Sequence, residues 1–173
     1  LGDFVAAFDH LVRLKAKGKI RHLGVTNFDS TRIEMLLETG ATIVTNQLQY
    51  SALDHRPECT MLKLAEEHQM PFLCYGVVAG GFLSDAYVGG DEIVGDLENR
   101  SLVKYKLIID EFGGWDLFQQ LLTTLKQISG RYEVGVAEVA IRYVLQKQGV
   151  GAAIVGARNR AHLDHLLKVF SFQ

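Results

Sequence analysis

The sequence predicts an α/β fold in which parallel strands alternate with helices. Four short segments have the apolar character of strands, at residues 20–27, 41–50, 71–78 and 151–157. Helix-like segments lie between them, and strand-then-helix order repeated along a chain predicts parallel pairing with right-handed crossovers. Each of the four segments also ends in polar or glycine residues, so functional groups are expected at one edge of the sheet.

Three helices are predicted in the first half of the chain, from apolar residues that recur at helical spacing. They cover residues 3–16, 31–38 and 58–68. The first has no strand before it, and Gly18 stands where it would end. Asp29 or Ser30 is the expected N-cap of the second, because a short side-chain oxygen can accept from the free amides of a first helical turn.

The second half of the chain departs from regular alternation. Residues 83–116 contain glycines and acidic side chains, and this stretch is far longer than the roughly 2 to 6 residues usual between a strand and a helix. We interpret it as an excursion over the site. Amphipathic spacing then predicts helices over 117–129, 136–148 and 161–169.

Composition argues against several classes of partner. With 18 Lys and Arg against 20 Asp and Glu, the net charge is -2, and no stretch concentrates basic residues as a nucleic-acid footprint would. No apolar run approaches the roughly 20 residues that cross a bilayer, so no membrane span is expected. Cys59 and Cys74 lack metal-ligand spacing and fit a soluble protein of a reducing compartment, with the cytoplasm as the default and an organelle as the alternative.

Two architectures satisfy this order of strands and helices: an open doubly wound sheet and a sector of a closed barrel. A doubly wound sheet would place a Gly-x-Gly-x-x-Gly turn after the first strand and an acidic residue about 20 positions later, and the sequence has neither. A barrel places functional residues at the carboxyl end of every strand, where Asn27, Gln47, Tyr75 and Arg158 fall. The barrel is therefore favoured.

Four segments resemble the aldo-keto reductase superfamily. They are GKIRHLGVTNF at 18–28, NQLQYS at 46–51, YGVVAGGFL at 75–83 and IVGARN at 154–159. Their order and spacing are similar to the family's carboxyl-terminal half, which forms strands five to eight of a TIM (β/α)8 barrel with their helices. The resemblance implies one partial barrel over residues 1–173, whose open sheet edges are covered by a missing amino-terminal half or by another protein chain.

The resemblance also implies ligands and a reaction. The family binds a nicotinamide dinucleotide and a small carbonyl substrate, and reduces aldehydes or ketones to alcohols. The implied cofactor is NADPH, with NADH as the alternative. The implied cofactor-binding residues are Thr26, Asn27, Gln47, Tyr75, Gly76, Val77, Val78, Gly80, Gly81, Gly156, Ala157 and Arg158.

Each implied role has a physical reason. The hydroxyl and amide side chains suit the nicotinamide carboxamide, which both donates and accepts hydrogen bonds. Tyr75 would stack on the nicotinamide ring, and the glycine turn that follows would approach the pyrophosphate closely because it lacks side-chain bulk. Gly156 and Ala157 would lie near the adenosine, and Arg158 is available for a 2'-phosphate.

The sequence also departs from the family's pattern. Asp85 or Ala86 stands where a Lys commonly follows the glycine turn, and His165-Leu166 replaces a pair that often contacts adenine. The family's catalytic Asp, Tyr, Lys and His belong to the amino-terminal half, so no catalytic residue is assigned and this chain alone is expected to be inactive. The alternative, from another class, is a non-catalytic nucleotide-binding or structural assembly subunit.

Two local features have less specific interpretations. His162 and His165, three residues apart, favour a solvated helix face over a metal site, since no further ligands accompany them. Trp115 either lines a substrate pocket or packs the excursion on the barrel, and the sequence leaves both open.

Overall fold

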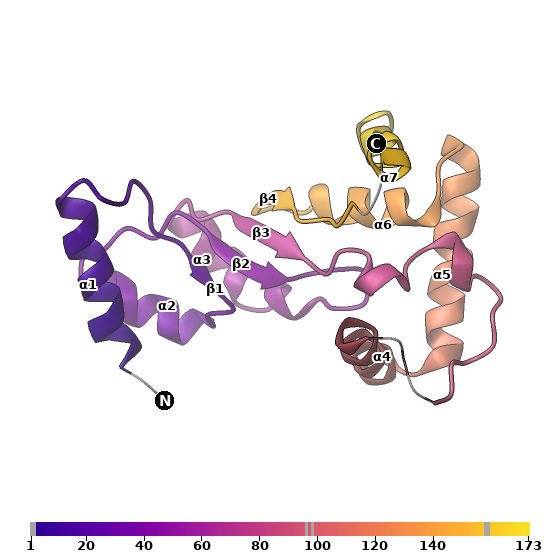
Figure 1. The fold of residues 1–173 in the computed structure, drawn as a ribbon, viewed down its shortest axis with the longest axis horizontal. Helices are drawn as coiled ribbons and strands as arrows, with labels where there is room; N and C mark the ends of the chain where they lie inside the picture. The colour runs from indigo at the N-terminus through magenta and orange to yellow at the C-terminus, as the bar shows by residue number, and fades with distance from the viewer. Residues whose placement is uncertain (1–2, 96, 98, 158–159) are drawn as a thin grey trace.

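One parallel sheet of four strands organises the molecule (Figure 1). A computed structural model describes residues 3–95, 97, 99–157 and 160–173. The strands are β1 (Val25–Thr26), β2 (Asn46–Gln49), β3 (Phe72–Tyr75) and β4 (Val150–Ala153). They pair in chain order, and all three pairings are parallel, which confirms the predicted α/β fold with part of a barrel sheet.

The strands are shorter than the predicted segments, although pairing extends slightly beyond them. The amide of Val25 donates to the Thr45 carbonyl at 2.9 Å, and the amide of Val44 donates to the Leu23 carbonyl at 2.8 Å. The apolar pattern marks which residues are buried, whereas a strand is defined only where two neighbours form a ladder. Apolar spacing therefore predicts longer strands than the sheet contains.

In the part of the chain that the structure describes, seven α-helices surround the sheet or extend from it. They are α1 (Phe4–Ala16), α2 (Ser30–Leu37), α3 (Met61–Glu67), α4 (Arg100–Phe112), α5 (Trp115–Tyr132), α6 (Val136–Leu145) and α7 (Arg160–Leu167), with 3-10 turns η1 (Arg56–Glu58), η2 (Ala79–Gly81), η3 (Asp85–Tyr87) and η4 (Lys168–Phe170). Asp29 is the N-cap of α2, because its Oδ1 accepts from the Arg32 amide at 2.8 Å. Within the described residues, no helix is both long and apolar enough to cross a membrane.

The predicted excursion over 83–116 contains an ordered helix that periodicity did not predict. Asn99 begins α4 by accepting from the Leu102 amide at 3.0 Å through its side chain. Tyr105 and Ile109, four positions apart, form its buried face. Glycines and acidic residues before Asn99 obscure this signal in the sequence. The second part of the predicted excursion is therefore a packed helix.

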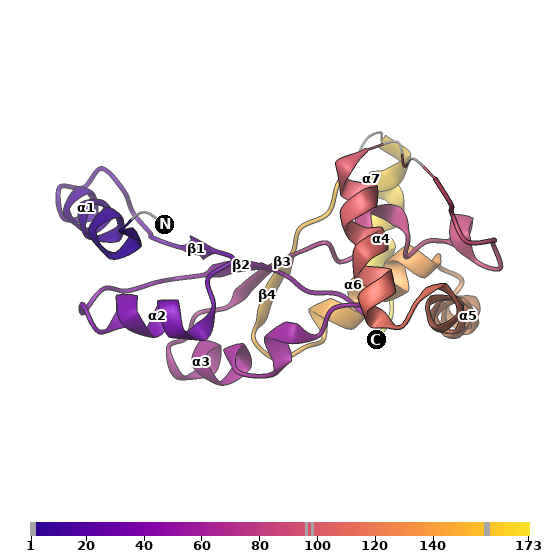
Figure 2. The ribbon, with the colours of Figure 1, turned by 90° about the horizontal axis from the view of Figure 1, so that it is seen from below.

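The apolar core falls into two clusters that lie toward opposite ends of the molecule (Figure 2). The first surrounds the sheet and includes Ile33, Leu36, Tyr50 and Phe72. The second joins α4, α5 and α6 and includes Phe82, Ile109, Phe118 and Leu122. Ala79 and Phe82, within and directly after η2, belong to the second cluster, so this cluster anchors the glycine turn.

Candidate cofactor site

Four of the predicted cofactor residues lie in or directly after β1, β2 and β3, but Gln47 lies inside β2, two residues before the strand end where it was predicted. Thr26 is the register partner of Gln47, and the amide of Asn27 donates to the Gln47 carbonyl at 2.8 Å. The hydroxyl of Tyr75 donates to Asn27 Oδ1 at 2.8 Å. Asn27 has a φ of 56°, a left-handed conformation that Asn tolerates better than most residues. The carboxyl ends of β1 and β3 thus bring Asn27 and the Tyr75 ring together, and Gln47 lies beside Thr26 in the neighbouring strand.

The glycine turn, which is residues 76–81 directly after β3, has positive φ angles and packs against Tyr105 of α4. Gly76 and Gly80 have φ angles of 72° and 67°. A methyl group added to Gly76 would lie 2.5 Å from the Tyr105 hydroxyl, and one added to Gly80 would lie 2.7 Å from the Tyr105 ring. Gly81, with a φ of 110°, has no described atom within 4 Å of such a methyl group. Tyr105 therefore fills the space beside the first two glycines, while the third faces open space.

A cavity of about 660 Å³ lies between the glycine turn and the segment that follows β4. Val78, Gly80 and Gly81 line it from the turn, and Gly156 lines it from the other side. These residues are far apart in the sequence, and the sheet order places β3 beside β4, which brings their following segments together. The volume lies in the roughly 300–1,000 Å³ range of small-molecule sites.

The remaining predicted residues are placed differently. Val77 is fully buried in the core around the sheet, so only its backbone belongs to the turn. Ala157 is exposed, next to Gly156 but outside the cavity lining. Arg158 lies outside the described residues. The described residues of the predicted site thus fall into two groups: the polar strand edge, which is Thr26, Asn27, Gln47 and Tyr75, and the cavity lined by Val78, Gly80, Gly81 and Gly156.

Acidic side chains and two histidines also line the cavity, and sequence reasoning did not assign them to the site. Glu138 is nearly buried, with 6% of its side chain exposed, and its Oε1 lies 3.2 Å from Nδ1 of His165. It stands in the first turn of α6, where the positive end of the helix dipole favours a carboxylate. An acid among the apolar Val136, Val139 and Ala140 is the signal that could have identified it.

The structure places the two histidines and Trp115 differently. His162 and His165 both line the cavity on α7, and the described residues contain no cluster of three or more metal-ligating side chains. Trp115 packs rather than lining the cavity: it is buried, its Nε1 donates to the Gly90 carbonyl at 3.0 Å, and its ring lies 6.3 Å from that of Phe82. Because Trp115 is the single tryptophan of the sequence, its fluorescence is sensitive to changes in the second core cluster.

Asp85, which lines the cavity, forms hydrogen bonds to residues of α5 and α6. Its Oδ2 accepts from the Val136 amide at 3.0 Å, which caps α6, and its Oδ1 accepts from Lys126 Nζ at 2.8 Å. Burial raises the pKa of this carboxyl, but Lys126 and the Val136 amide outweigh that effect and hold the pKa below its ordinary value. Asp85 thus substitutes for a side-chain cap that Gly135 cannot provide.

We expect Asp85→Ala to lower the free energy of unfolding by about 1 kcal/mol at pH 7, as loss of a helix cap does. Because the folded pKa is lowered, the contribution is fully present above the ordinary value of 3.8 and is lost as the pH falls through the folded value. Urea unfolding at pH 7 and pH 3 measures the difference. Asp91→Ala, at an exposed position, is the control. An equal effect of the two variants at pH 7 would contradict the capping role.

The sequence is similar to those of several known proteins. The chain is 28% identical over 128 residues to Flagellar radial spoke protein 5 of Chlamydomonas reinhardtii, covering 72% of this chain and 24% of that protein. It is 25% identical over 156 residues to the aldo-keto reductase YhdN of Bacillus subtilis, covering 88% and 44%. The chain thus spans less than half the length of these two relatives.

Solved structures show the same partial coverage. A glycerol dehydrogenase from Gluconobacter oxydans superimposes with a TM-score of 0.76 at 23% identity, over 94% of this chain and 47% of that one. An aldo/keto reductase from Klebsiella pneumoniae in complex with NADP and acetate gives a TM-score of 0.65 at 19% identity, over 98% and 49%. Residues 3–173 match the sequence profile of the aldo/keto reductase family, and the chain belongs to that family.

Proposed function

We propose that this chain forms the cofactor half of an NAD(P)H-dependent oxidoreductase that reduces aldehydes or ketones to alcohols. The observation that carries the proposal is the cavity between the glycine turn and the segment after β4, because that turn directly follows Tyr75 at the end of β3. A dinucleotide has a polar carboxamide at one end and a bulky nucleoside at the other. Its site therefore needs a polar region for the carboxamide and a cavity for the nucleoside. The Klebsiella pneumoniae structure in complex with NADP and acetate supports this assignment.

The residues present fit a dinucleotide. Gly81 has no side chain, and no described atom lies within 4 Å of where one would begin. A phosphate can therefore approach the backbone closely at this position. Thr26, Asn27 and Gln47 supply both donors and acceptors for the carboxamide. The hydrogen bond from Tyr75 to Asn27 fixes the tilt of the ring on which the nicotinamide would stack. NADPH is the proposed form, with NADH as the alternative.

In this proposal the chain binds the cofactor and supplies no proton donor for the reaction. The bound dinucleotide supplies hydride to a carbonyl carbon. The residues described above bind and orient that ligand, and they hold no assigned acid. The catalytic Asp, Tyr, Lys and His would come from an amino-terminal half of the barrel, so we expect the 173-residue chain alone to be inactive.

A second candidate function is a nucleotide-binding or structural assembly subunit without catalysis. Tyr105 fills the space beside Gly76 and Gly80, which leaves less of the turn open to a ligand. The likeness to a flagellar radial spoke protein also favours a role in an assembly. In this account β1 and β4, the two edges of the sheet, pair with another protein chain.

Blocking the cavity tests the proposal. Ala137 is half-buried on α6 and lines the cavity, so Ala137→Phe fills it without altering the glycine turn. We expect NADPH titration followed by Trp115 fluorescence to show saturable binding that this variant weakens by at least about tenfold, because the ring takes the ligand's volume. Ala16→Phe, at an exposed position on α1, is the matched control.

The outcomes separate the two candidate functions. Saturable NADPH binding that is lost in Ala137→Phe and kept in Ala16→Phe supports the cofactor site. Carbonyl-dependent NADPH oxidation by the full product of the gene, and none by the 173-residue chain, then favours the reductase over the assembly subunit. A folded chain and a folded full product that both fail to bind NADPH would overturn the cofactor assignment.

A further inference from the structure

Lys104 holds a positive charge over the ring on which the nicotinamide would stack. Its Nζ lies 4.7 Å from the centroid of the Tyr75 ring and 5.1 Å from that of Tyr105. Both distances are within the roughly 6 Å at which an ammonium group is attracted to an aromatic face. Nothing in the sequence connects this lysine with the site, because the apolar spacing does not predict α4.

The position of Lys104 is set by the residue beside it. Tyr105 is buried, and its ring packs against Gly76 and Gly80 of the glycine turn. Through this contact α4 packs against the glycine turn, which begins directly after Tyr75. Lys104, although exposed, is therefore attached to a backbone that is fixed relative to the Tyr75 ring.

The charge of Lys104 is not balanced by a carboxylate among the described residues. Lys106, two positions along α4, pairs with Glu92 at 2.8 Å and Asp110 at 2.5 Å, whereas Lys104 has no described ion-pair partner. The pKa of Arg56 is raised mainly by its hydrogen bond to Asp54 and only slightly by Tyr75, and Arg56 pairs with Asp54 at 2.6 Å. The local excess of positive charge near the Tyr75 ring therefore comes from Lys104.

This arrangement distinguishes the two redox states of nicotinamide. The oxidised ring carries a positive charge and the reduced ring is neutral, so a nearby ammonium repels only the oxidised form. The oxidised ring would also compete with Lys104 for the electron-rich face of Tyr75, while the reduced ring has no charge to place there. Both effects have the same sign.

We propose that Lys104 is a specificity-determining residue that favours binding of the reduced dinucleotide over the oxidised one, and so biases this site toward carbonyl reduction. The inference rests on the proposed function, since it requires that the nicotinamide stacks on Tyr75. It adds a discriminating residue from α4 to the residues of the strand edge. The predicted quantity is the ratio of the dissociation constants for NADP+ and NADPH.

The test removes the charge and keeps the aliphatic stem. In Lys104→Met we expect the NADP+ to NADPH ratio to fall by roughly fivefold to tenfold, the effect of one unit charge several Å away at an intermediate dielectric. Lys104→Arg should restore the ratio to within about twofold of the wild type, since it keeps the charge near the ring. Both constants are measured by equilibrium dialysis on the full product of the gene.

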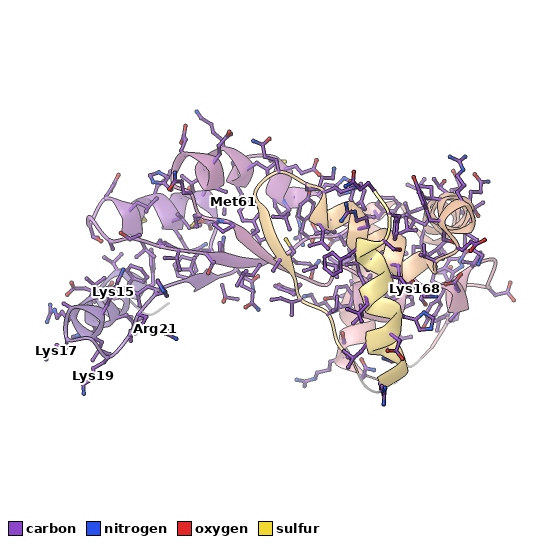
Figure 3. All side chains as sticks on the ribbon, turned by 90° about the horizontal axis from the view of Figure 1, so that it is seen from above. Lys15, Lys17, Lys19, Arg21, Met61 and Lys168 are labelled. Atoms are coloured by element: carbon purple, nitrogen blue, oxygen red, sulfur yellow. The ribbon has the colours of Figure 1, made fainter. Side chains whose placement is uncertain are left out.

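A matched control removes a lysine far from the site. Lys17 is exposed and lies with Lys15, Lys19 and Arg21 at the end of the molecule opposite α4 and α5 (Figure 3). Lys17→Met changes the net charge equally and should leave the ratio unchanged. Any fall in the ratio that Lys17→Met shares with Lys104→Met would show a general charge effect and overturn the inference.

The remaining outcomes are distinct. Binding of both dinucleotides with an unchanged ratio in Lys104→Met overturns the role of Lys104 and leaves the proposed function intact. Failure of the folded wild-type protein to bind either dinucleotide overturns the proposed function and this inference with it. A reduced ratio in Lys104→Met, restored in Lys104→Arg, supports the inference.

Discussion

Gly76→Val is expected to destabilise the protein by about 3 kcal/mol or more. A β-branched residue at a φ of 72° carries a backbone penalty of roughly 1–2 kcal/mol, and overpacking adds about 1–3 kcal/mol. The new side chain would begin 2.5 Å from the Tyr105 hydroxyl and 3.0 Å from its ring, so α4 must move away from the turn. Urea unfolding measures the loss, and hydrogen exchange of α4 should accelerate.

The control for this change is Gly156→Ala. Gly156 has no positive φ, and no described atom lies within 4 Å of an added methyl group. Its free energy of unfolding should change by no more than about 0.5 kcal/mol. If Gly76→Val were as stable as Gly156→Ala, the packing of Tyr105 on the glycine turn would be wrong.

Phe118→Ala is expected to cost about 3–5 kcal/mol, the range for removing a fully buried aromatic ring. Phe118 has no exposed surface and lies between Trp115, at 5.0 Å between ring centroids, and Phe82, at 6.2 Å. Its loss leaves a cavity under the glycine turn that neighbouring rings cannot fill. Thermal and urea unfolding measure the loss, and Trp115 emission should shift as its environment loosens.

The adjacent residue provides the comparison. Leu117 is 40% exposed on the same helix, so Leu117→Ala removes a large apolar side chain from a position that borders water. It should cost clearly less than Phe118→Ala. Equal losses at the two positions would contradict the placement of the second core cluster against α5.

Much of the fold could be predicted because its signals are local. Alternating apolar strands and amphipathic helices identified β1 to β4, and Asp29 was one of two expected caps for α2. The helix α4 was missed, since glycines and acids precede its first turn at Asn99. Its spacing of Tyr105 and Ile109 is helical, but two buried positions in a polar stretch do not stand out.

The candidate site divides in the same way. The glycine turn and the strand-end residues carry local patterns, so the resemblance could name them by position. The packing of Tyr105 on Gly76 joins residues that are far apart along the chain, and no sequence period encodes it. Glu138 and Asp85 reach the cavity wall through the arrangement of α6 against η3, which only the tertiary structure provides.

Hydrogen exchange with and without NADPH tests the central claim most directly, because it locates the ligand on the chain. If the cavity binds the dinucleotide, amides in residues 76–81 and 155–157 should both be protected on addition of NADPH, together with those at the strand edge around residue 27. Protection at neither segment in a folded protein, or protection confined to another surface, would contradict the account.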